Sequence, residues 1–199
     1  MNFLAHLYFA ENSQHSLYGN LLGDFVKGSP DQFIDPVILN GIAQHRAIDK
    51  YTDAHPVVKR SKSRISAERR RFSGIMIDVF YDHYLAINWE QYSPENFSIQ
   101  TSDWYNKLKK ETYLVLPARF SRTIEMMTKN DWFSMYKEPA GINKAIDGIS
   151  KRIRFENNMH GGGVELTNNY DALEDDFHAF FPDLVTFVRS YQKKLDSVC

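Results

Sequence analysis

Cysteine and long hydrophobic runs are nearly missing from this sequence. Cys199 is the one cysteine among 199 residues, so a disulfide within the chain and a zinc site built from several cysteines are both excluded. No segment approaches the ~20 consecutive apolar residues of a membrane-spanning helix. The start, MNFLAHLYFAENSQ, has no basic segment and no small-residue cleavage site, which argues against a signal peptide. We therefore expect a cytoplasmic protein without a membrane partner.

An excess of charge of either sign is also missing. The 24 lysines and arginines nearly balance the 25 aspartates and glutamates, and the formal net charge is −1. Whole-molecule charge therefore predicts no nucleic-acid partner, and only local clusters of charge can indicate a binding surface. Hydrophobic residues make up 43% of the chain, which is ordinary for a folded domain. The sequence leaves the oligomeric state open.

The apolar residues recur mainly with the period of an α-helix, and the alternation typical of strands is almost absent. One helix is expected to start with Asp35 as N-cap and Pro36 in its first turn, and to end near Asp53 because Pro56 follows. The segment FSGIMIDVFYDHYLAINW is apolar nearly all the way round, which predicts a central buried helix. We predict one all-α domain, a helical bundle, that spans residues 1–199.

The second half of the chain is less regular. Residues 91–103, which include Pro94, are expected to form a loop. The following segments are expected to be one or two helices over 103–136 with a break or kink at Pro117, a short helix over 139–153, a glycine-containing connection over 157–169, and one or two helices over 170–195 with a bend at Pro182.

Histidines and aspartates concentrate in the first 85 residues. His45, Asp49 and Asp53 are spaced i, i+4, i+8, so they drift by only ~80° and line one side of their helix. Asp78 and Asp82 are also four residues apart, on the otherwise apolar central helix, and His83 follows directly. Two interpretations remain open for these carboxylates, namely ion pairs with arginines such as Arg46 or those of the 69–71 run, or a metal site.

A divalent metal would explain why acidic groups sit on an apolar helix. Burying a carboxylate costs several kcal/mol unless a cation or strong donors compensate. Oxygen and imidazole ligands suit Mn²⁺, Fe²⁺, Mg²⁺ or Zn²⁺. Asp24 follows a helix end, where a negative charge is unfavourable, so its position also invites an explanation. The candidate metal ligands are Asp24, His45, Asp78, Asp82 and His83, with His6 as the next candidate.

Four ordered segments carry a resemblance. MNFLAHLYFA, GNLLGDFVKG, GIAQHRAIDKYTDAHP and GIMIDVFYDHYLAINW resemble the acyl carrier protein phosphodiesterases, also called acyl carrier protein hydrolases. The likeness is dense over residues 1–90 and looser afterwards. That family is similar to the HD-type metal-dependent phosphohydrolases, so the resemblance implies an HD-domain-like helical fold. In HD-type enzymes an adjacent His-Asp pair binds metal, whereas here Asp82 precedes His83.

The resemblance implies a reaction and a cofactor. The family removes 4′-phosphopantetheine from holo acyl carrier protein by hydrolysing a phosphodiester to a serine, and it is similar to enzymes that use Mn²⁺ or Mg²⁺. We expect a divalent metal, first Mn²⁺ and otherwise Mg²⁺ or Fe²⁺, with Asp24, His45 and Asp82 at the centre of the chemistry. Asp49 or Asp53 would then orient the ligand imidazoles.

Three further residues receive roles from their type and place in the sequence. Lys27 or Arg46 would hold phosphate oxygens by charge-assisted hydrogen bonds. His55 would act as the acid for the serine leaving group.

A basic run, KRSKSRISAERRR, suggests a docking surface. It contains Lys59, Arg60, Lys62, Arg64, Arg69, Arg70 and Arg71 against one acid, Glu68. Either it is a solvated connection, or it attracts an acidic partner such as holo acyl carrier protein. For docking, the candidates are Lys59, Arg60, Arg64, Arg69, Arg70 and Arg71.

Two rival functions remain open at this point. One is an HD-type phosphohydrolase that acts on a nucleotide or another small phosphoester, although the sequence offers no P-loop and no recognisable nucleic-acid module. The other is a non-catalytic helical binding protein whose acids and histidines are structural ion pairs. Bound divalent metal, or thermal stabilisation by Mn²⁺, would separate the second from an enzyme.

Overall fold

The computed structural model describes residues 1–30 and 33–196, and that part of the chain contains helices and no strand. The helices are α1 (Phe3–Tyr8), α2 (Gln14–Leu22), α3 (Pro36–Ala54), α4 (Pro56–Arg64), α5 (Ser73–Ile87), α6 (Trp89–Tyr92), α7 (Phe97–Leu108), α8 (Ala118–Lys129), α9 (Trp132–Met135), α10 (Pro139–Ser150), α11 (Val164–Asn168) and α12 (Tyr170–Asp196), with a 3₁₀ turn η1 (Arg70–Phe72) before α5. The predicted all-α class is confirmed. Cys199 lies outside the described residues.

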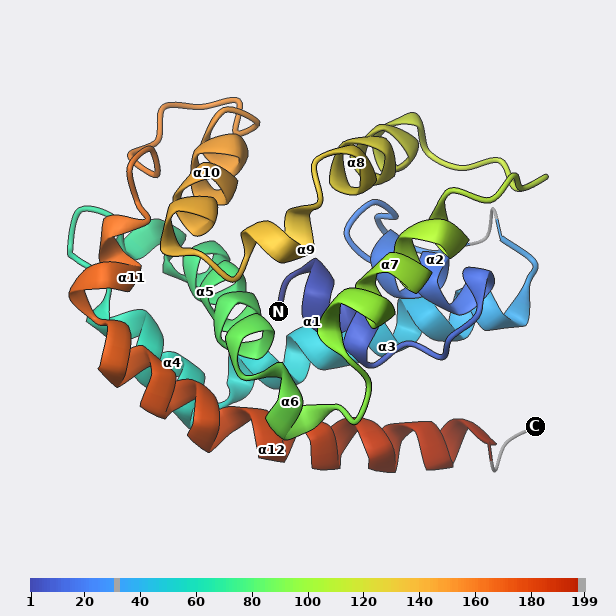
Figure 1. The fold of residues 1–199 in the computed structure, drawn as a ribbon, viewed down its shortest axis with the longest axis horizontal. Coiled ribbons are helices and arrows are strands. Elements are labelled where there is room, and N and C mark those ends of the chain that lie inside the picture. The colour runs from blue at the N-terminus through green and yellow to red at the C-terminus, as the bar shows by residue number, and fades with distance from the viewer. Residues whose placement is uncertain (31–32, 197–199) are drawn as a thin grey trace.

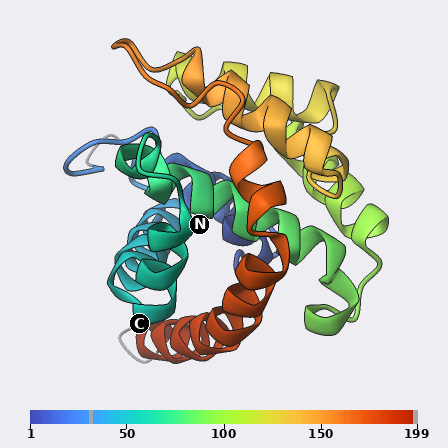
Figure 2. The same ribbon diagram turned by 90° about the vertical axis from the view of Figure 1, so that its left-hand side faces the viewer.

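Helix α5 is central, as its sequence predicted. It packs against α1, α4, α10 and α12, and most of its side chains are buried. Helix α12 runs along one side of the molecule against α3, α4 and α5 (Figure 1). Helices α8 and α10 flank α9 on another side and form a layer of their own (Figure 2). Within the described residues, no helix combines the length and the hydropathy needed to cross a membrane.

Helix α3 begins and ends where the sequence predicted. The carboxylate of Asp35 accepts hydrogen bonds from the backbone N–H groups of Val37 and Ile38, at 2.8 and 3.2 Å. These bonds satisfy two of the amides that a helix leaves free in its first turn. The helix stops at Ala54 because Pro56 opens α4. This local chemistry fixes the helix that carries His45 and Asp49.

The expected loop over residues 91–103 is confirmed only for residues 93–96, because α6 extends to Tyr92 and α7 begins at Phe97. Asn96 is the N-cap, and its side-chain oxygen accepts from the amides of Ser98 and Ile99. Pro94 lies before this cap, so it does not interrupt the helix. The expected connection over 157–169 is also partly helical, because α11 occupies Val164–Asn168. Helix α12 is one continuous helix with Pro182 inside it, and its path curves (Figure 1).

Helices α2 and α3 touch backbone to backbone through two glycines. A Cβ atom on Gly41 would lie 2.8 Å from the Cα of Gly19, which no real pair of carbons tolerates. We expect Gly41→Ala to force the helices apart and to lower the free energy of unfolding by about 1–3 kcal/mol, the usual range for overpacking. Chemical denaturation measures this loss. The matched control is Gly148→Ala in α10, where the added carbon meets nothing within 4 Å and stability should stay the same or rise. Equal effects of the two substitutions would contradict the close packing.

Candidate metal centre

The imidazole of His45 is held in one orientation by the backbone. Its Nδ1 atom lies 2.6 Å from the carbonyl oxygen of Asn20. A carbonyl can only accept, so Nδ1 carries the proton and donates. The Nε2 atom then faces two carboxylates, at 3.1 Å from Oδ2 of Asp49 and 3.5 Å from Oδ1 of Asp24. A ring nitrogen fixed in this way by a carbonyl is the usual arrangement of a metal-binding histidine.

The end of helix α2 makes room for this ring. Helix α2 stops at Leu22, and Gly23 follows as its C-cap. A Cβ atom on Gly23 would lie 2.2 Å from Cγ and Cδ2 of His45. Glycine is therefore required if the imidazole is to lie against this backbone. Asp24, the next residue, is half-exposed and faces the same ring.

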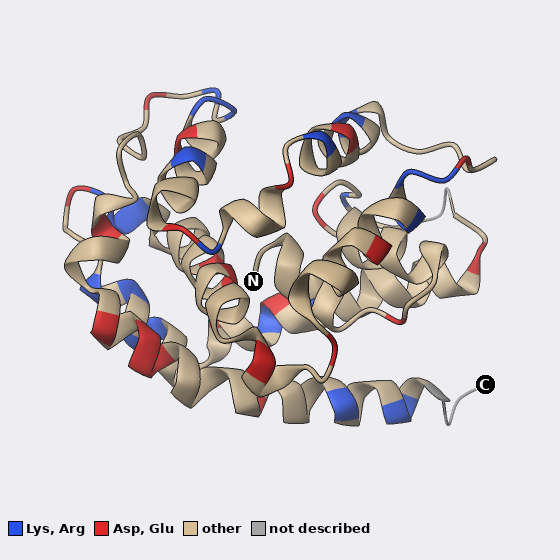
Figure 3. Cartoon of the chain, in the orientation of Figure 1, with Lys and Arg blue, Asp and Glu red and all other residues tan. Residues whose placement is uncertain are grey.

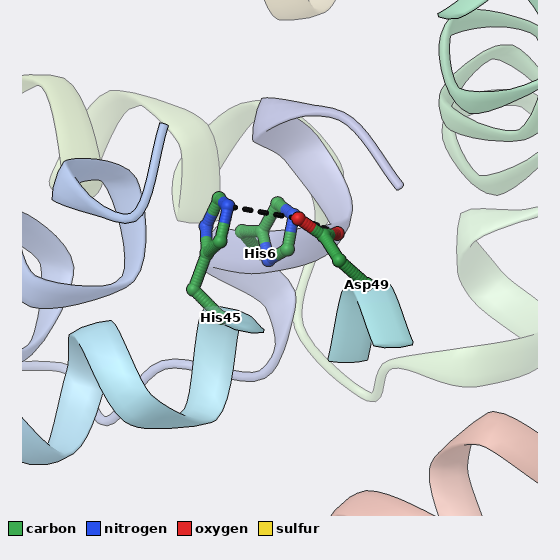
Figure 4. A group of neighbouring side chains, drawn as sticks. All are labelled: His6, His45 and Asp49. Atoms are coloured by element: carbon green, nitrogen blue, oxygen red, sulfur yellow. Dashed lines mark ion pairs between the residues drawn. The ribbon is translucent and has the colours of Figure 1, made fainter. Parts of the chain in front are cut away.

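His6 is brought to the same place by helix α1. Its ring stacks on His45 with centroids 3.7 Å apart and planes at 13°, and its Nε2 atom lies 3.2 Å from Oδ1 of Asp49 (Figure 4). His6 is fully buried, yet neither ring nitrogen has a hydrogen bond of acceptable geometry, and the same is true of Asp49 Oδ1. Buried polar atoms without partners cost about 1–3 kcal/mol each. A metal ion that binds the lone pairs of these atoms would remove that cost.

His6, His45, Asp49 and Asp24 form a cluster, and the electrostatics of this cluster favour a bound cation. Burial lowers the pKa of His45, but hydrogen bonds from the ring to Asp24 and Asp49 outweigh it and raise the pKa to about 9. Burial, followed by the charge of His45, lowers the pKa of His6 to about 4. The pKa of Asp49 is well below its usual range because the two histidines outweigh the effect of burial. The carboxylates of Asp24 and Asp49 thus favour positive charge at Nε2 of His45, which a proton or a metal ion can supply.

The donor set and its spacing fit a divalent ion. One nitrogen each from His6 and His45 and one oxygen of Asp49 all lie within 4.8 Å of one another. Asp24 adds a second carboxylate beside His45. Imidazole and carboxylate ligands suit Mn²⁺, Fe²⁺, Zn²⁺ or Mg²⁺. The sequence predicted only an orienting role for Asp49, although its place four residues after His45 already puts both groups on one face of the helix.

Asp78 reaches the cluster only through the chain's own amino group. The α-amino group of Met1 lies 2.8 Å from Oδ1 of Asp78 and 3.5 Å from Oδ1 of Asp49. Although burial lowers the pKa of this amine, Asp78 and Asp49 raise it to about 10. Asp78 therefore has a cationic partner of its own, and it lies one group further from the histidines than Asp49 does.

Asp82 holds the start of helix α1. Its two carboxylate oxygens accept from the backbone N–H groups of Leu4 and Ala5, at 2.8 and 3.2 Å. Asn2, the N-cap of α1, makes no side-chain capping bond, so Asp82 replaces the cap from another helix. Burial raises the pKa of Asp82 to about 7, with the two amides opposing the shift. His6 follows Leu4 and Ala5 directly in α1. Asp82 therefore helps to fix the position of His6.

Comparison with known proteins decides the family. A family model described as acyl carrier protein phosphodiesterase matches residues 1–184. A protein named acyl carrier protein phosphodiesterase from Enterobacter sp. (strain 638) is 34% identical over 195 residues, covering 96% of this chain and 100% of that protein. One of the same name from Escherichia coli O139:H28 is 35% identical over 186 residues, covering 93% of this chain and 96% of the other.

The chain belongs to the acyl carrier protein phosphodiesterase family. The match includes every residue of the cluster and every helix that carries one. No solved structure matches the chain significantly. The sequence comparisons therefore confirm the expected family membership. The structure shows how the residues of the cluster meet.

Other predicted site residues of this family member lie elsewhere. His83 uses both ring nitrogens away from the cluster, with Nδ1 at 2.7 Å from the carbonyl of Tyr136 and Nε2 at 2.8 Å from the hydroxyl of Tyr170. His55 caps α4 through the amide of Val57 and packs its ring against Phe180. The structure thus does not bring His83 or His55 to the histidine pair.

The predicted phosphate-binding residues and Asp53 are also outside the cluster. Arg46 donates from Nη2 to the carbonyl of Val26 at 2.8 Å, which fixes the loop after α2. Lys27 lies in that loop with its side chain exposed. Asp53 pairs with Lys62 at 2.6 Å instead of orienting a histidine.

The basic run of residues 59–71 is largely occupied by contacts within the chain. Arg60 and Arg64 both bind the buried carboxylate of Asp176 on α12, at 2.7 and 2.8 Å. Figure 3 shows the basic residues of α4 beside the acidic residues of α12. The other members contact Glu165 and Asn158 (Arg69), the carbonyl of Ile65 (Arg70) and the rings of Phe72 and Phe155 (Arg71), whereas Lys59 is exposed. Much of this charge therefore joins α4 and η1 to the C-terminal helices.

Proposed function

We propose that the chain removes 4′-phosphopantetheine from holo acyl carrier protein by metal-dependent hydrolysis of the phosphodiester to the carrier serine. The observation that carries the proposal is the buried group of His6, His45 and Asp49, found in a member of the acyl carrier protein phosphodiesterase family. These three residues and Asp24 would hold the ion. We take Mn²⁺ as the first candidate, with Mg²⁺ or Fe²⁺ as alternatives.

The chemistry requires that negative charge on the phosphodiester be offset. A bound divalent ion supplies this by neutralising phosphoryl oxygens and by lowering the pKa of water. The chain supplies orientation, because Asn20 fixes the tautomer of His45 and Asp82 fixes the start of α1. Asp24 would act as a ligand of the ion. The pKa of its carboxylate is lowered because hydrogen bonding to His45 outweighs the effect of burial, so the group is ionised near neutral pH and can bind a cation.

Several finer assignments belong to the same proposal. Kinship with the HD-type phosphohydrolases is supported by the all-α fold and by the pairing of imidazoles with carboxylates. Asp78, Asp82 and His83 stay predicted metal ligands, and measurement of the metal-bound protein would test them. The cytoplasmic location also stays a prediction.

Mass spectrometry gives the direct test of the proposed reaction. Purified protein with Mn²⁺ should convert holo acyl carrier protein to the apo form, and a chelator should stop the conversion. Retention of the full holo mass after long incubation with Mn²⁺, Mg²⁺ and Fe²⁺ would contradict the proposal. Hydrolysis of nucleotides or other small phosphoesters without action on the holo carrier would favour the rival phosphohydrolase instead.

A further inference from the structure

A cavity of about 730 Å³ opens beside the candidate metal centre. Its walls come from α1, α8, α9 and α10, and Asp24 lines it as well as lying 3.5 Å from His45. Apolar side chains cover much of the wall, among them Phe25, Trp132 and Ile149. The volume suits a ligand of ordinary metabolite size, for which pockets of roughly 300–1,000 Å³ are typical. One end of such a ligand would meet the metal centre.

Four cationic side chains surround this cavity. Arg119 and Arg122 come from α8, Lys144 from α10, and Arg152 follows α10. Asp24 is the one acidic residue in the lining, and no described carboxylate forms an ion pair with any of the four cations. Positive charge is therefore in excess in the lining of this cavity.

The contrast with the basic run of residues 59–71 decides which positive surface is available. There, Arg60, Arg64 and Arg69 are bound to carboxylates of the same chain. Around the cavity the cations are exposed, and the contact found for Arg119 is with the ring of Phe25, at 5.6 Å. Positive charge without an internal partner attracts and orients an acidic partner. The cavity therefore combines apolar walls with four exposed cations, which we call its entrance, and it also includes Asp24.

We propose that this cavity binds the phosphopantetheine arm of holo acyl carrier protein, and that Arg119, Arg122, Lys144 and Arg152 face the acidic surface of the carrier. The inference rests on the proposed function. The arm is a flexible chain of methylene, dimethyl and amide groups, which suits walls such as Phe25 and Trp132, and its phosphodiester would come to the side of Asp24. Carrier proteins of this kind present carboxylates around the modified serine, which complements the cationic entrance.

Gly148 offers a way to fill the cavity without disturbing the fold. It lies in α10 and lines the cavity, and a Cβ atom there meets nothing within 4 Å. Gly148→Phe should block the cavity and lower kcat/KM for holo carrier about 100-fold or more, while Gly148→Ala should stay near the wild type. Both variants should melt at or above the wild-type temperature, and both should bind Mn²⁺ with wild-type affinity, because a Cβ atom at position 148 meets no other group within 4 Å.

Charge reversal tests the entrance separately. The double variant Arg119→Glu/Arg122→Glu should raise KM for holo carrier by about tenfold or more at low salt, with a smaller effect at high salt because screening already weakens the attraction. The control is Lys59→Glu, an exposed cation of the basic run, which should change KM little. A larger loss from Lys59→Glu than from the double variant would overturn the assignment of the entrance.

Different results would contradict the proposed function and the cavity assignment. If wild-type protein leaves holo carrier unchanged, the proposed function falls. If wild-type protein converts the carrier and Gly148→Phe does so at the same rate, the cavity assignment alone falls. Inhibition by free 4′-phosphopantetheine gives a second readout, since it should be lost in Gly148→Phe and kept in Gly148→Ala.

Discussion

His45→Ala is expected to remove metal binding and to lower the hydrolysis of holo acyl carrier protein by about 1,000-fold or more. His45 is the residue that touches every other member of the cluster, through Asp24, Asp49 and the stacked ring of His6. A metal contributes several kcal/mol of transition-state stabilisation, and each ~1.4 kcal/mol is tenfold in rate. Titration calorimetry with Mn²⁺ and the mass-spectrometric assay measure the two losses.

His160→Ala is the matched control for this experiment. His160 is exposed and pairs with Asp147 at 3.1 Å, in a loop outside the cluster. It should leave Mn²⁺ affinity and turnover unchanged. If His45→Ala also kept both, the metal centre would have to be placed elsewhere.

Gly23→Ala probes the same centre without removing a ligand. Its methyl group would overlap Cγ and Cδ2 of His45, so the imidazole has to move away from Asn20 and Asp24. We expect weaker Mn²⁺ binding and slower turnover by about 10–100-fold, the range found when the support of a metal ligand is disturbed. Unchanged Mn²⁺ affinity would mean that the ring has another stable position.

Local patterns in the sequence were sufficient where the interactions are local. Helix α3 could be predicted because Asp35, Pro36 and Pro56 define its ends within a few residues. The shared face of His45 and Asp49 follows from the helical period alone. The start of α7 was not predicted, because Pro94 indicates a loop while the capping side chain of Asn96, two residues later, starts a helix.

Long-range partners could not be predicted in the same way. The spacing of Asp78 and Asp82 shows that they lie on one turn, but their partners are groups of residues 1, 4 and 5, some 77 positions away in the chain. The pairing of Arg60 and Arg64 with Asp176 depends on how α12 returns past α4, over more than 100 residues. Spacing gives the face of a helix, whereas the tertiary fold decides what that face meets.

Asp82→Ala is expected to lower the free energy of unfolding by about 2–4 kcal/mol. The substitution leaves the amides of Leu4 and Ala5 buried without acceptors, and hydrogen bonds to a charged group contribute about 1.5–3 kcal/mol each. Part of this loss is offset, because burial raises the pKa of Asp82 to about 7 and an ionised carboxylate is costly there. Denaturation by urea without added metal measures the effect.

Asp82→Asn separates support of α1 from direct binding of metal. Asparagine keeps one oxygen for the amide of Leu4 and puts an NH₂ group near that of Ala5, so the metal-free protein should lose less stability than with alanine. If Asp82 acts through α1, hydrogen exchange of the α1 amides should rise in proportion to the stability lost, and Mn²⁺ affinity should fall in the same order, alanine more than asparagine. If Asp82 were itself a ligand, both variants would lose Mn²⁺ binding to the same extent, whatever their difference in metal-free stability and α1 exchange. The outcome decides whether the acidic group on α5 holds the metal or holds the helix that presents His6.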